Sequence, residues 1–366
     1  MTTNQKNYTQ KIFAFLDILG FEPIVNQSRT NPELVNRIAN ILQRSKKVAV
    51  SNINAKLTVL KVDPTQYKHL TFSDTSTISG PYVSHDDIDF ISTWIIIYQY
   101  LMWKEEQTFV RGAVVYGDIY QDEEVLFGPA LIDAYHLESD KNKAVWPRVL
   151  IDESLLAKIT QTELRRDLHE FMRIDDNLVY LDYLRELFHY LVLAQTKKIN
   201  KERKEDLGQP AKLFEQHKEA IMTQIRYASS QKNKLDSTKI LTKYLKLSEY
   251  HNSTIDRFRR VINDLTADNS IVRDFFNDRL KFDKAEISGI KYEPKYSAEE
   301  HPEQADMLNI LAIAVSSVLT PLLEVEQQYQ ISDVDVIDTI SRNIPQQLTT
   351  LDIRLKDAII DVASLL

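Results

Sequence analysis

Cysteine is absent from this chain of 366 residues. Its absence excludes disulfide bonds, thiolate nucleophiles and zinc sites built on cysteine. Long hydrophobic runs are missing as well: the most apolar stretch, Met307–Leu323, is shorter than the roughly 20 residues that a membrane-spanning helix needs, and Pro321 interrupts it. The opening residues, MTTNQKNYTQ, contain no apolar segment typical of a secretory signal. We therefore expect a cytoplasmic protein without a membrane partner.

The chain has no excess of positive charge. Lysine and arginine number 45 against 53 aspartates and glutamates, which gives a formal net charge of −8. A general nucleic-acid binder gains affinity by displacing counterions from phosphates with its cations, so this balance argues against one. The composition, 43% hydrophobic and 27% charged, is typical of a folded globular protein.

Glycine is scarce, and its distribution is informative. Only seven are present, and five stand in the first third of the chain: Gly20, Gly80, Gly112, Gly117 and Gly128. Glycine is retained where a backbone turns tightly or approaches a ligand closely. The same third alternates between strand-like and helix-like patterns, which favours an α+β sandwich.

Individual elements of this region follow from hydrophobic periodicity. Strands are predicted at Lys11–Asp17, Ala55–Val62, His69–Ser79, Phe109–Tyr116, Glu124–Phe127 and Val145–Ile151. Helices are predicted at Pro32–Val48, Asp86–Lys104 and Gly128–Ser139.

After about residue 152 the pattern becomes helical, with expected helices that include Ser154–Thr160, Glu163–Met172, Lys212–Ala228 and Asp236–Asp264. We divide the chain into a mixed domain (1–155), a helical extension packed on it (156–265) and a mostly helical region without an assigned role (266–366).

Two acids and a glycine-rich segment are the candidates for chemistry. Asp17 stands at a strand end before the turn at Gly20, and Asp74 stands at a hairpin bend. Two carboxylates on neighbouring strand ends suit Mg²⁺ or Mn²⁺, which prefer oxygen ligands and leave positions open for phosphates. An aspartate at a strand end is also a common turn or cap residue, so a purely structural role stays open for both.

Five motifs resemble, in order and spacing, those of the class III nucleotide cyclases, and most closely those of the bacterial pyrimidine cyclases of the Pycsar anti-phage system. They are FLDILGF (Phe15–Phe21), FSD (Phe72–Asp74), RGAVVYG (Arg111–Gly117), GPALIDAYHLE (Gly128–Glu138) and PRVLID (Pro147–Asp152). The resemblance covers residues 11–152 and continues weakly through Leu178–Leu184 and Lys243–Asn252. It implies a class III cyclase-like α/β sandwich with a ferredoxin-like core, followed by the helical extension.

The resemblance also implies a reaction and a ligand set. Asp17, Asp74 and the backbone carbonyl of Ile18 would bind two Mn²⁺ or Mg²⁺ ions. Backbone amides would bind the triphosphate at Leu19, Gly20, Phe21 and Glu22. The ribose 3′-oxygen would attack the α-phosphorus and release pyrophosphate. Class III domains work as head-to-tail dimers, so a homodimer with sites at its interface is implied.

Departures from the purine cyclases indicate the substrate class. The base-reading Lys and Asp of those enzymes fall here on Leu70 and Val125, which favours a pyrimidine. The resemblance to the pyrimidine subgroup, in which uridylate cyclases are commoner, places UTP ahead of CTP. The helical Asn and Arg that stabilise their transition state fall on Ile132 and His136. Another cation is therefore needed, and the candidates are Arg148, Arg111 and His136 itself.

Three hypotheses remain open at this point. The first is a cyclase that makes cyclic UMP or cyclic CMP as a defence signal for a cyclic-nucleotide-gated effector. The second is a degenerate cyclase fold that senses a ligand or partner without turnover. The third is a conventional adenylate or guanylate cyclase, which Leu70 and Val125 disfavour.

Overall fold

A computed structural model describes residues 7–51, 62–122, 124–161, 163–164, 171–175, 177–187, 210–230, 234–265, 270, 273–274 and 285. Its elements are, in chain order, β1 (Thr9–Ile18), α1 (Phe21–Ser28), α2 (Pro32–Ser51), the 3-10 turn η1 (Pro64–Gln66), β2 (Lys68–Phe72), β3 (Thr75–Gly80), α4 (His85–Glu106), β4 (Val110–Gln121), β5 (Leu126–Phe127), α5 (Pro129–Ser139), β6 (Val149–Ile151), α6 (Glu153–Lys158), β7 (Met172–Asp175), β8 (Leu178–Leu181), α10 (Pro210–Ser230) and α11 (Lys234–Leu265).

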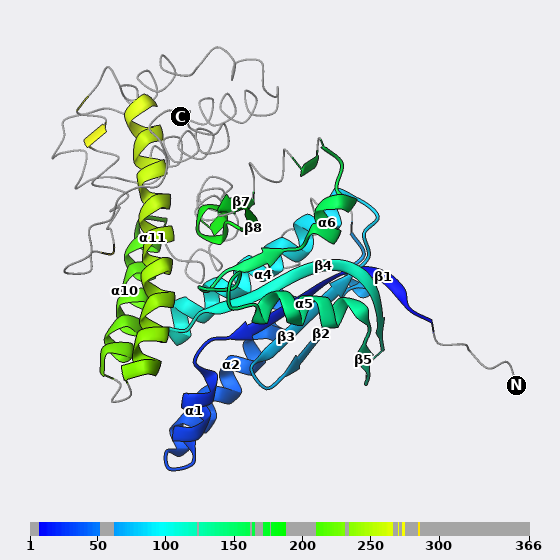
Figure 1. The fold of residues 1–366 in the computed structure, drawn as a ribbon, viewed down its shortest axis with the longest axis horizontal. Coiled ribbons are helices and arrows are strands. Elements are labelled where there is room, and N and C mark those ends of the chain that lie inside the picture. The colour runs from blue at the N-terminus through cyan, green and yellow to red at the C-terminus, as the bar shows by residue number, and fades with distance from the viewer. Residues whose placement is uncertain are drawn as a thin grey trace, which may run out of the picture. The chain divides into compact units, whose positions relative to one another are not determined.

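The strands form one sheet in the order β2-β3-β1-β4-β6-β8-β7, with β5 paired to β4 (Figure 1). Strands β2, β3, β1 and β4 pair with one another in antiparallel fashion, whereas β6 pairs with β4 in parallel. Helices α1 and α2 separate β1 from β2, and α4 separates β3 from β4. This βαββαβ succession with the order β2-β3-β1-β4 is the ferredoxin-like arrangement. The prediction of an α+β fold with such a core is confirmed.

The alternation of side chains along β1 divides the sheet into two faces. Leu16 pairs in register with Ser76, whose hydroxyl lies 3.4 Å from the Tyr98 hydroxyl of α4. Phe13 and Phe15 point the other way, where α5 covers the sheet. Because the period of a strand is two residues, Asp17 falls on the α5 face together with these phenylalanines.

Helix α4 is buried around nearly its whole circumference. Trp94, Tyr98 and Trp103 have at most 1% of their surface exposed. Its first turn carries a capping box, in which Ser84 and Asp87 exchange side-chain and backbone hydrogen bonds. The sequence predicted a mostly buried helix over Asp86–Lys104, and the structure confirms it.

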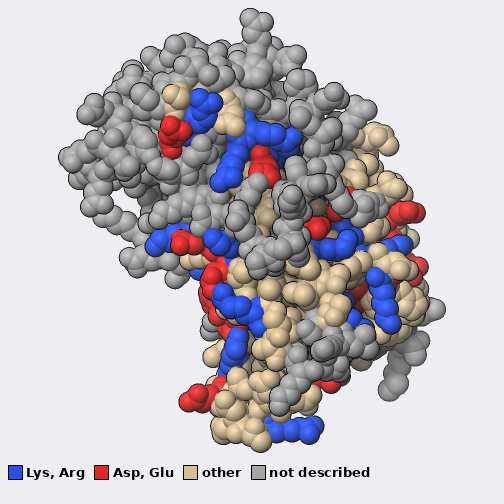
Figure 2. All heavy atoms as spheres, turned by 60° about the vertical axis from the view of Figure 1, so that its left-hand side comes forward, with Lys and Arg blue, Asp and Glu red and all other residues tan. Residues whose placement is uncertain are grey.

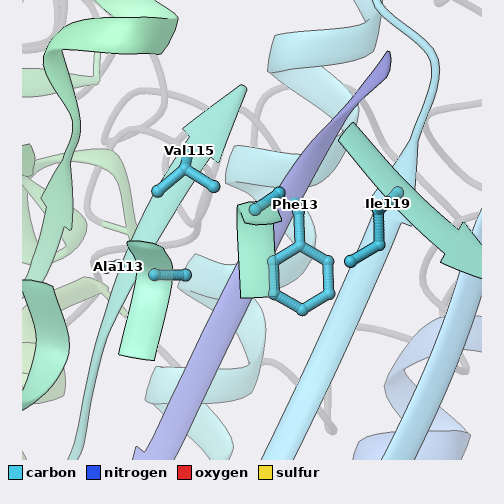
Figure 3. Packing of buried hydrophobic residues seen from close by; sticks show 6 residues of the cluster. Phe13, Ala113, Val115 and Ile119 are labelled. Atoms are coloured by element: carbon cyan, nitrogen blue, oxygen red, sulfur yellow. The ribbon is translucent and has the colours of Figure 1, made fainter. Parts of the chain in front are cut away.

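Helix α5 packs closely on the opposite face because its inner side consists of small residues. Ala130 and Ala134 are fully buried against Phe13, Ala113, Val115 and Ile119 (Figure 3). The N-cap residue before the helix is Gly128, whose φ of 150° is rarely adopted by other residues. A Cβ added there would lie 2.6 Å from the carbonyl oxygen of Asp118 on β4, so only glycine allows this close approach.

One predicted helix is partly wrong, and one predicted strand lies almost entirely outside the described residues. The helix expected over Glu163–Met172 is wrong at its end, because Met172 begins the β7–β8 hairpin, which extends the sheet beyond β6. The strand expected over Ala55–Val62 lies almost entirely outside the described residues. Helices α10 and α11 match the predicted Lys212–Ala228 and Asp236–Asp264 to within a few residues.

Contacts divide the chain into two compact units, one formed by Met1–Tyr183 with Ala220–Leu247, the other by Leu184–Glu219 with Ser248–Leu366. The first unit contains the entire sheet, the C-terminal half of α10 and the N-terminal half of α11. Within the described part of the chain, no helix has the length and apolar character needed to cross a bilayer. The apolar stretch Met307–Leu323 lies outside that part.

Candidate active site

Asp17 lies at the carboxyl end of β1, between two partner strands. It pairs in register with Arg111 of β4 on one side and with Thr75 of β3 on the other. Its side chain is 19% exposed, so the carboxylate is largely withdrawn from water. Phe13, Phe15 and Asp17 therefore lie on the same face of β1, and the last of these three side chains is an acid.

Asp74 is held next to this strand end by the β2–β3 hairpin. The hairpin turn consists of Ser73 and Asp74, and Ser73 adopts a left-handed φ of 53°. The amide of Ile18 donates a hydrogen bond of 3.0 Å to the carbonyl of Asp74. The two predicted acids, which are far apart in the sequence, thus stand on adjacent strand ends.

Arg111 connects Asp17 to α5. Its Nε donates to the Asp17 carboxylate at 3.2 Å and lies 2.5 Å from the Glu138 carboxylate. Glu138 follows Ala130 and Ala134 at helical intervals of four, so it lies on the same buried side of α5. We call Asp17, Arg111 and Glu138 the Asp17 cluster.

Burial makes the acids of this cluster weaker than usual. Desolvation raises the pKa of Glu138 to about 7, although the charge of Arg111 acts in the opposite direction. Desolvation also raises the pKa of Asp17, and the neighbouring charge of Asp74 adds to the effect while Arg111 opposes it. The positive charge of Arg111 thus does not fully offset the cost of burying the two carboxylates.

The donor set fits a divalent cation of the magnesium type. Asp17 and Asp74 supply two carboxylates on adjacent strand ends, and the pKa of Asp17 is raised by burial and, to a lesser extent, by the negative charge of Asp74. Among the described residues, no group of three or more histidine, aspartate or glutamate side chains converges as a complete metal cage. Two carboxylates with room for substrate oxygens are the usual arrangement for magnesium at phosphate-transfer sites.

Gly20 turns the chain from β1 into α1. Its φ of 76° is left-handed, and it forms the N-cap position of the helix without a side-chain cap. The amide of Leu19 already donates to the carbonyl of Phe109 at 2.9 Å. Of the amides predicted to bind a triphosphate, those of Gly20, Phe21 and Glu22 belong to the turn and the first residues of α1.

Other predicted residues have different surroundings. Arg148 is 3% exposed, donates to the carbonyl of Lys143 at 2.8 Å and lies about 5 Å from the Trp146 and Tyr180 rings. These contacts are those of a buried packing residue. His136 is exposed on α5. Leu70 and Val125 are 38% and 44% exposed, so both could be covered by a ligand or partner.

Sequence reasoning underestimated Glu138 and did not consider Lys243. Glu138 enters the sequence analysis only as the last residue of the Gly128–Glu138 motif, but its interval of four from Ala134 places it on the buried side of α5. Lys243, on α11, interacts electrostatically with Asp17 and Glu138. The cyclase resemblance continues weakly from Lys243 onward, but the approach of this lysine to the acids depends on how α11 packs.

Surface charge elsewhere is mixed. On the face drawn in Figure 2, lysine and arginine side chains alternate with aspartate and glutamate among the described residues. A polyanion would meet both signs of charge there.

Comparisons with known proteins find no matching family model and no matching curated protein. Among solved structures, the chain is similar to two chains of a bacterial light-regulated adenylyl cyclase, each at 13% identity, with TM-scores of 0.33 and 0.31. These matches cover 49% and 48% of this chain, and 52% and 91% of the two compared chains.

A further similar structure is the adenylyl cyclase CyaB from P. aeruginosa, at 15% identity and a TM-score of 0.33, over 48% of this chain and 93% of that one. The chain thus spans about half the length of the first of these structures. Because all three TM-scores lie below 0.5, the fold is assigned from strand order and register alone.

Proposed function

We propose that this protein is a nucleotide cyclase that converts UTP, or less favourably CTP, into the 3′,5′-cyclic monophosphate and pyrophosphate. The observation that carries the proposal is the juxtaposition of Asp17 and Asp74 on adjacent strand ends of a ferredoxin-like sheet. The order of the five cyclase-like motifs along the same strands and helix supports it.

The reaction needs positioning and charge neutralisation. Asp17, Asp74 and the carbonyl of Ile18 would hold two Mn²⁺ or Mg²⁺ ions, which supply Lewis acidity and neutralise phosphate charge. The amides of the Gly20 turn would orient the triphosphate. The ribose 3′-oxygen forms a bond to the α-phosphorus as the bond to the β-phosphate oxygen breaks. The hydroxyl proton passes to solvent, and pyrophosphate leaves.

The apolar residues at the base-reading positions support a pyrimidine substrate. A site that hydrogen-bonds a purine edge needs a polar donor and acceptor, and discrimination falls when they are missing. Leu70 and Val125 offer neither through their side chains. The preference for UTP over CTP rests on the resemblance, in which uridylate cyclases are the commoner kind.

A homodimer is part of the same proposal. Large apolar side chains stand exposed on β2, near β5 and on α5: Leu70, Phe72, Val125, Phe127, Ile132 and Tyr135. Burying them against a second copy would complete the sites. We expect Ile132→Asp, on the exposed side of α5, to shift the mass measured by light scattering from dimer to monomer. An unchanged dimer in this variant would contradict the assignment of this face.

The resemblance to the Pycsar cyclases suggests a biological role. A cyclic pyrimidine nucleotide made in the cytoplasm would act as a signal in anti-phage defence by opening or activating a cyclic-nucleotide-gated effector. Loss of protection when Asp74→Asn replaces the natural chain in phage-challenged cells would support this role.

A second candidate is a cyclase-fold binding protein without turnover. It is favoured by Ile132 and His136, which stand where the purine cyclases carry their transition-state Asn and Arg. The decisive experiment incubates the full chain with each of the four nucleoside triphosphates and Mn²⁺, and identifies cyclic products by mass spectrometry. We expect cyclic UMP from the natural chain and none from Asp74→Asn. The binding-protein hypothesis predicts no product from either.

A further inference from the structure

Helix α11 brings a lysine to the Asp17 cluster. Lys243 lies in the segment Ala220–Leu247, which belongs to the same compact unit as the sheet. The ring of the adjacent Tyr244 packs against Phe109, with the ring centroids 5.8 Å apart. Phe109 precedes Arg111 by two residues, and its carbonyl accepts the Leu19 amide. The helix is thus anchored beside the strand ends that carry Asp17 and Arg111.

Helix α10 makes a second contact in the same place. The side-chain amide of Gln224 donates to the backbone carbonyl of Gln107, at the end of α4 and just before β4. Two helices from the extension therefore contact the Gln107–Phe109 segment that leads into Arg111. This attachment limits how far the α11 backbone can move from the cluster.

Lys243 interacts electrostatically with the Asp17 cluster. Burial lowers the pKa of Lys243, as does the like charge of Arg111, while Asp17 and Glu138 oppose this shift. Conversely, the charge of Lys243 acts to lower the pKa of both acids. Each of the three residues of the Asp17 cluster thus interacts with this one lysine.

The two cations differ in how they are occupied. Arg111 is engaged by two carboxylates, one from β1 and one from α5. If Asp17 and Asp74 held divalent ions, these ions would neutralise carboxylate charge that now balances Arg111 and Lys243. Two like charges brought together by the fold then favour an anionic ligand between them. A lysine ammonium on its flexible stem is suited to bind phosphate oxygens as a point charge.

We propose that Lys243 is a catalytic cation of this site: it binds the triphosphate of the substrate and neutralises the charge that develops on the leaving pyrophosphate. It replaces the helical arginine whose place on α5 is taken by His136. This inference rests on the proposed function. It makes the helical extension a part of the active site.

The experiment compares the natural full-length chain with Lys243→Met, Lys243→Arg and Lys239→Met. Lys239 is exposed one turn earlier on the same helix, so its replacement is a matched control. Steady-state kinetics with UTP and Mn²⁺ are measured, together with calorimetric binding of inorganic triphosphate. For Lys243→Met we expect about a 100-fold loss of kcat/KM, carried by kcat, and weaker binding of triphosphate. Lys243→Arg should recover most of the loss, and Lys239→Met should behave as the natural chain.

The outcomes separate the two proposals. If the natural chain is active and Lys243→Met matches it in kcat/KM and triphosphate affinity, the inference is overturned while the cyclase survives. If Lys243→Met and Lys243→Arg lose the same amount of kcat/KM and both have a lowered melting temperature, Lys243 has a packing role. That result also overturns the inference. If the natural chain makes no cyclic product, the cyclase fails. Triphosphate binding that still depends on Lys243 would then support the lysine as a phosphate ligand.

Discussion

Among the described residues, two of the places where ionisable side chains are withdrawn from water show opposite consequences of burial. In the Asp17 cluster, acids are held beside Arg111, and burial raises their pKa values. In the second compact unit, His217 of α10 and His251 of α11 are fully buried, with their Nδ1 atoms 3.0 Å apart. Burial lowers the pKa of His217 far below its usual value, and the neighbouring His251 adds to this shift.

The difference between the two places lies in their partners. A neutral imidazole can donate to another neutral imidazole, so the histidine pair is satisfied without charge. Phe214 and Phe258, both fully buried, pack in the same region, and the Phe214 ring lies 6.1 Å from that of His251. The Asp17 cluster instead keeps opposite charges together, and the pKa values of its acids are still raised by burial. Burial of an ionisable group is therefore not by itself evidence of a functional site. Buried charges at a strand end that are incompletely balanced are better evidence of one.

The largest expected effect concerns Asp17, and it tests whether this acid acts in catalysis or only supports the fold. Replacing Asp17 by Asn should lower cyclase activity by about 1,000-fold, because a carboxylate that would hold the phosphate-neutralising divalent ions is lost. Product formation is measured by mass spectrometry with Mn²⁺ and UTP. Asp133→Asn, an exposed acid on α5, is the control and should retain activity. Full activity in Asp17→Asn would refute the chemical role of the cluster.

The next effect concerns stability. The pKa of Glu138 is about 7 in the folded protein and 4.5 in a free side chain, so the folded state binds this proton more tightly. Its contribution therefore makes the free energy of unfolding fall as pH rises from about 4.5 to about 7. Glu138→Gln should remove this loss and raise stability at pH 8 by up to about 3 kcal/mol relative to the natural chain.

This stability difference is read from thermal melts of both proteins at pH 5 and pH 8. The natural chain should lose more stability between the two pH values than Glu138→Gln does. Parallel pH dependences would show that Glu138 is already ionised without penalty in the folded protein.

The histidine pair should show the reverse dependence on pH. A depressed folded pKa means that the unfolded chain binds the proton more readily, so stability is present above pH 6.5 and is lost as pH falls below it. His217→Phe should lose less thermal stability than the natural chain between pH 7 and pH 5. His136→Phe, at an exposed position, is the control. If the exposed and buried variants respond alike, the contrast drawn above does not hold.

The smallest expected effect lies in the hairpin that carries Asp74. Ser73 adopts a left-handed φ of 53°, which costs a non-glycine residue roughly 1–2 kcal/mol. Ser73→Gly relieves this strain but gives the unfolded chain more freedom, so a net gain of about 0.5 kcal/mol is expected in denaturant titrations. A loss of stability would mean that the serine side chain supports the turn.

Much of the fold could be predicted because the relevant signals are local. The short apolar run in Lys11–Asp17, the apolar helix of Asp86–Lys104 and the glycine before Pro129 each indicate one element, and each is found. The β7–β8 hairpin escaped prediction because its short strands carry little periodic signal. Their strand state is set by pairing with β6 and with each other.

The site divides in the same way. The sequence by itself determined that Asp17 ends a strand, that Asp74 occupies a bend and that Gly20 follows with a turn, because these depend on neighbouring residues only. Tertiary structure alone decided that Arg111 stands opposite Asp17, that Glu138 completes the ion pair from α5 and that Lys243 approaches from α11. Those contacts depend on strand register and helix packing, which bring together charges separated by long stretches of chain.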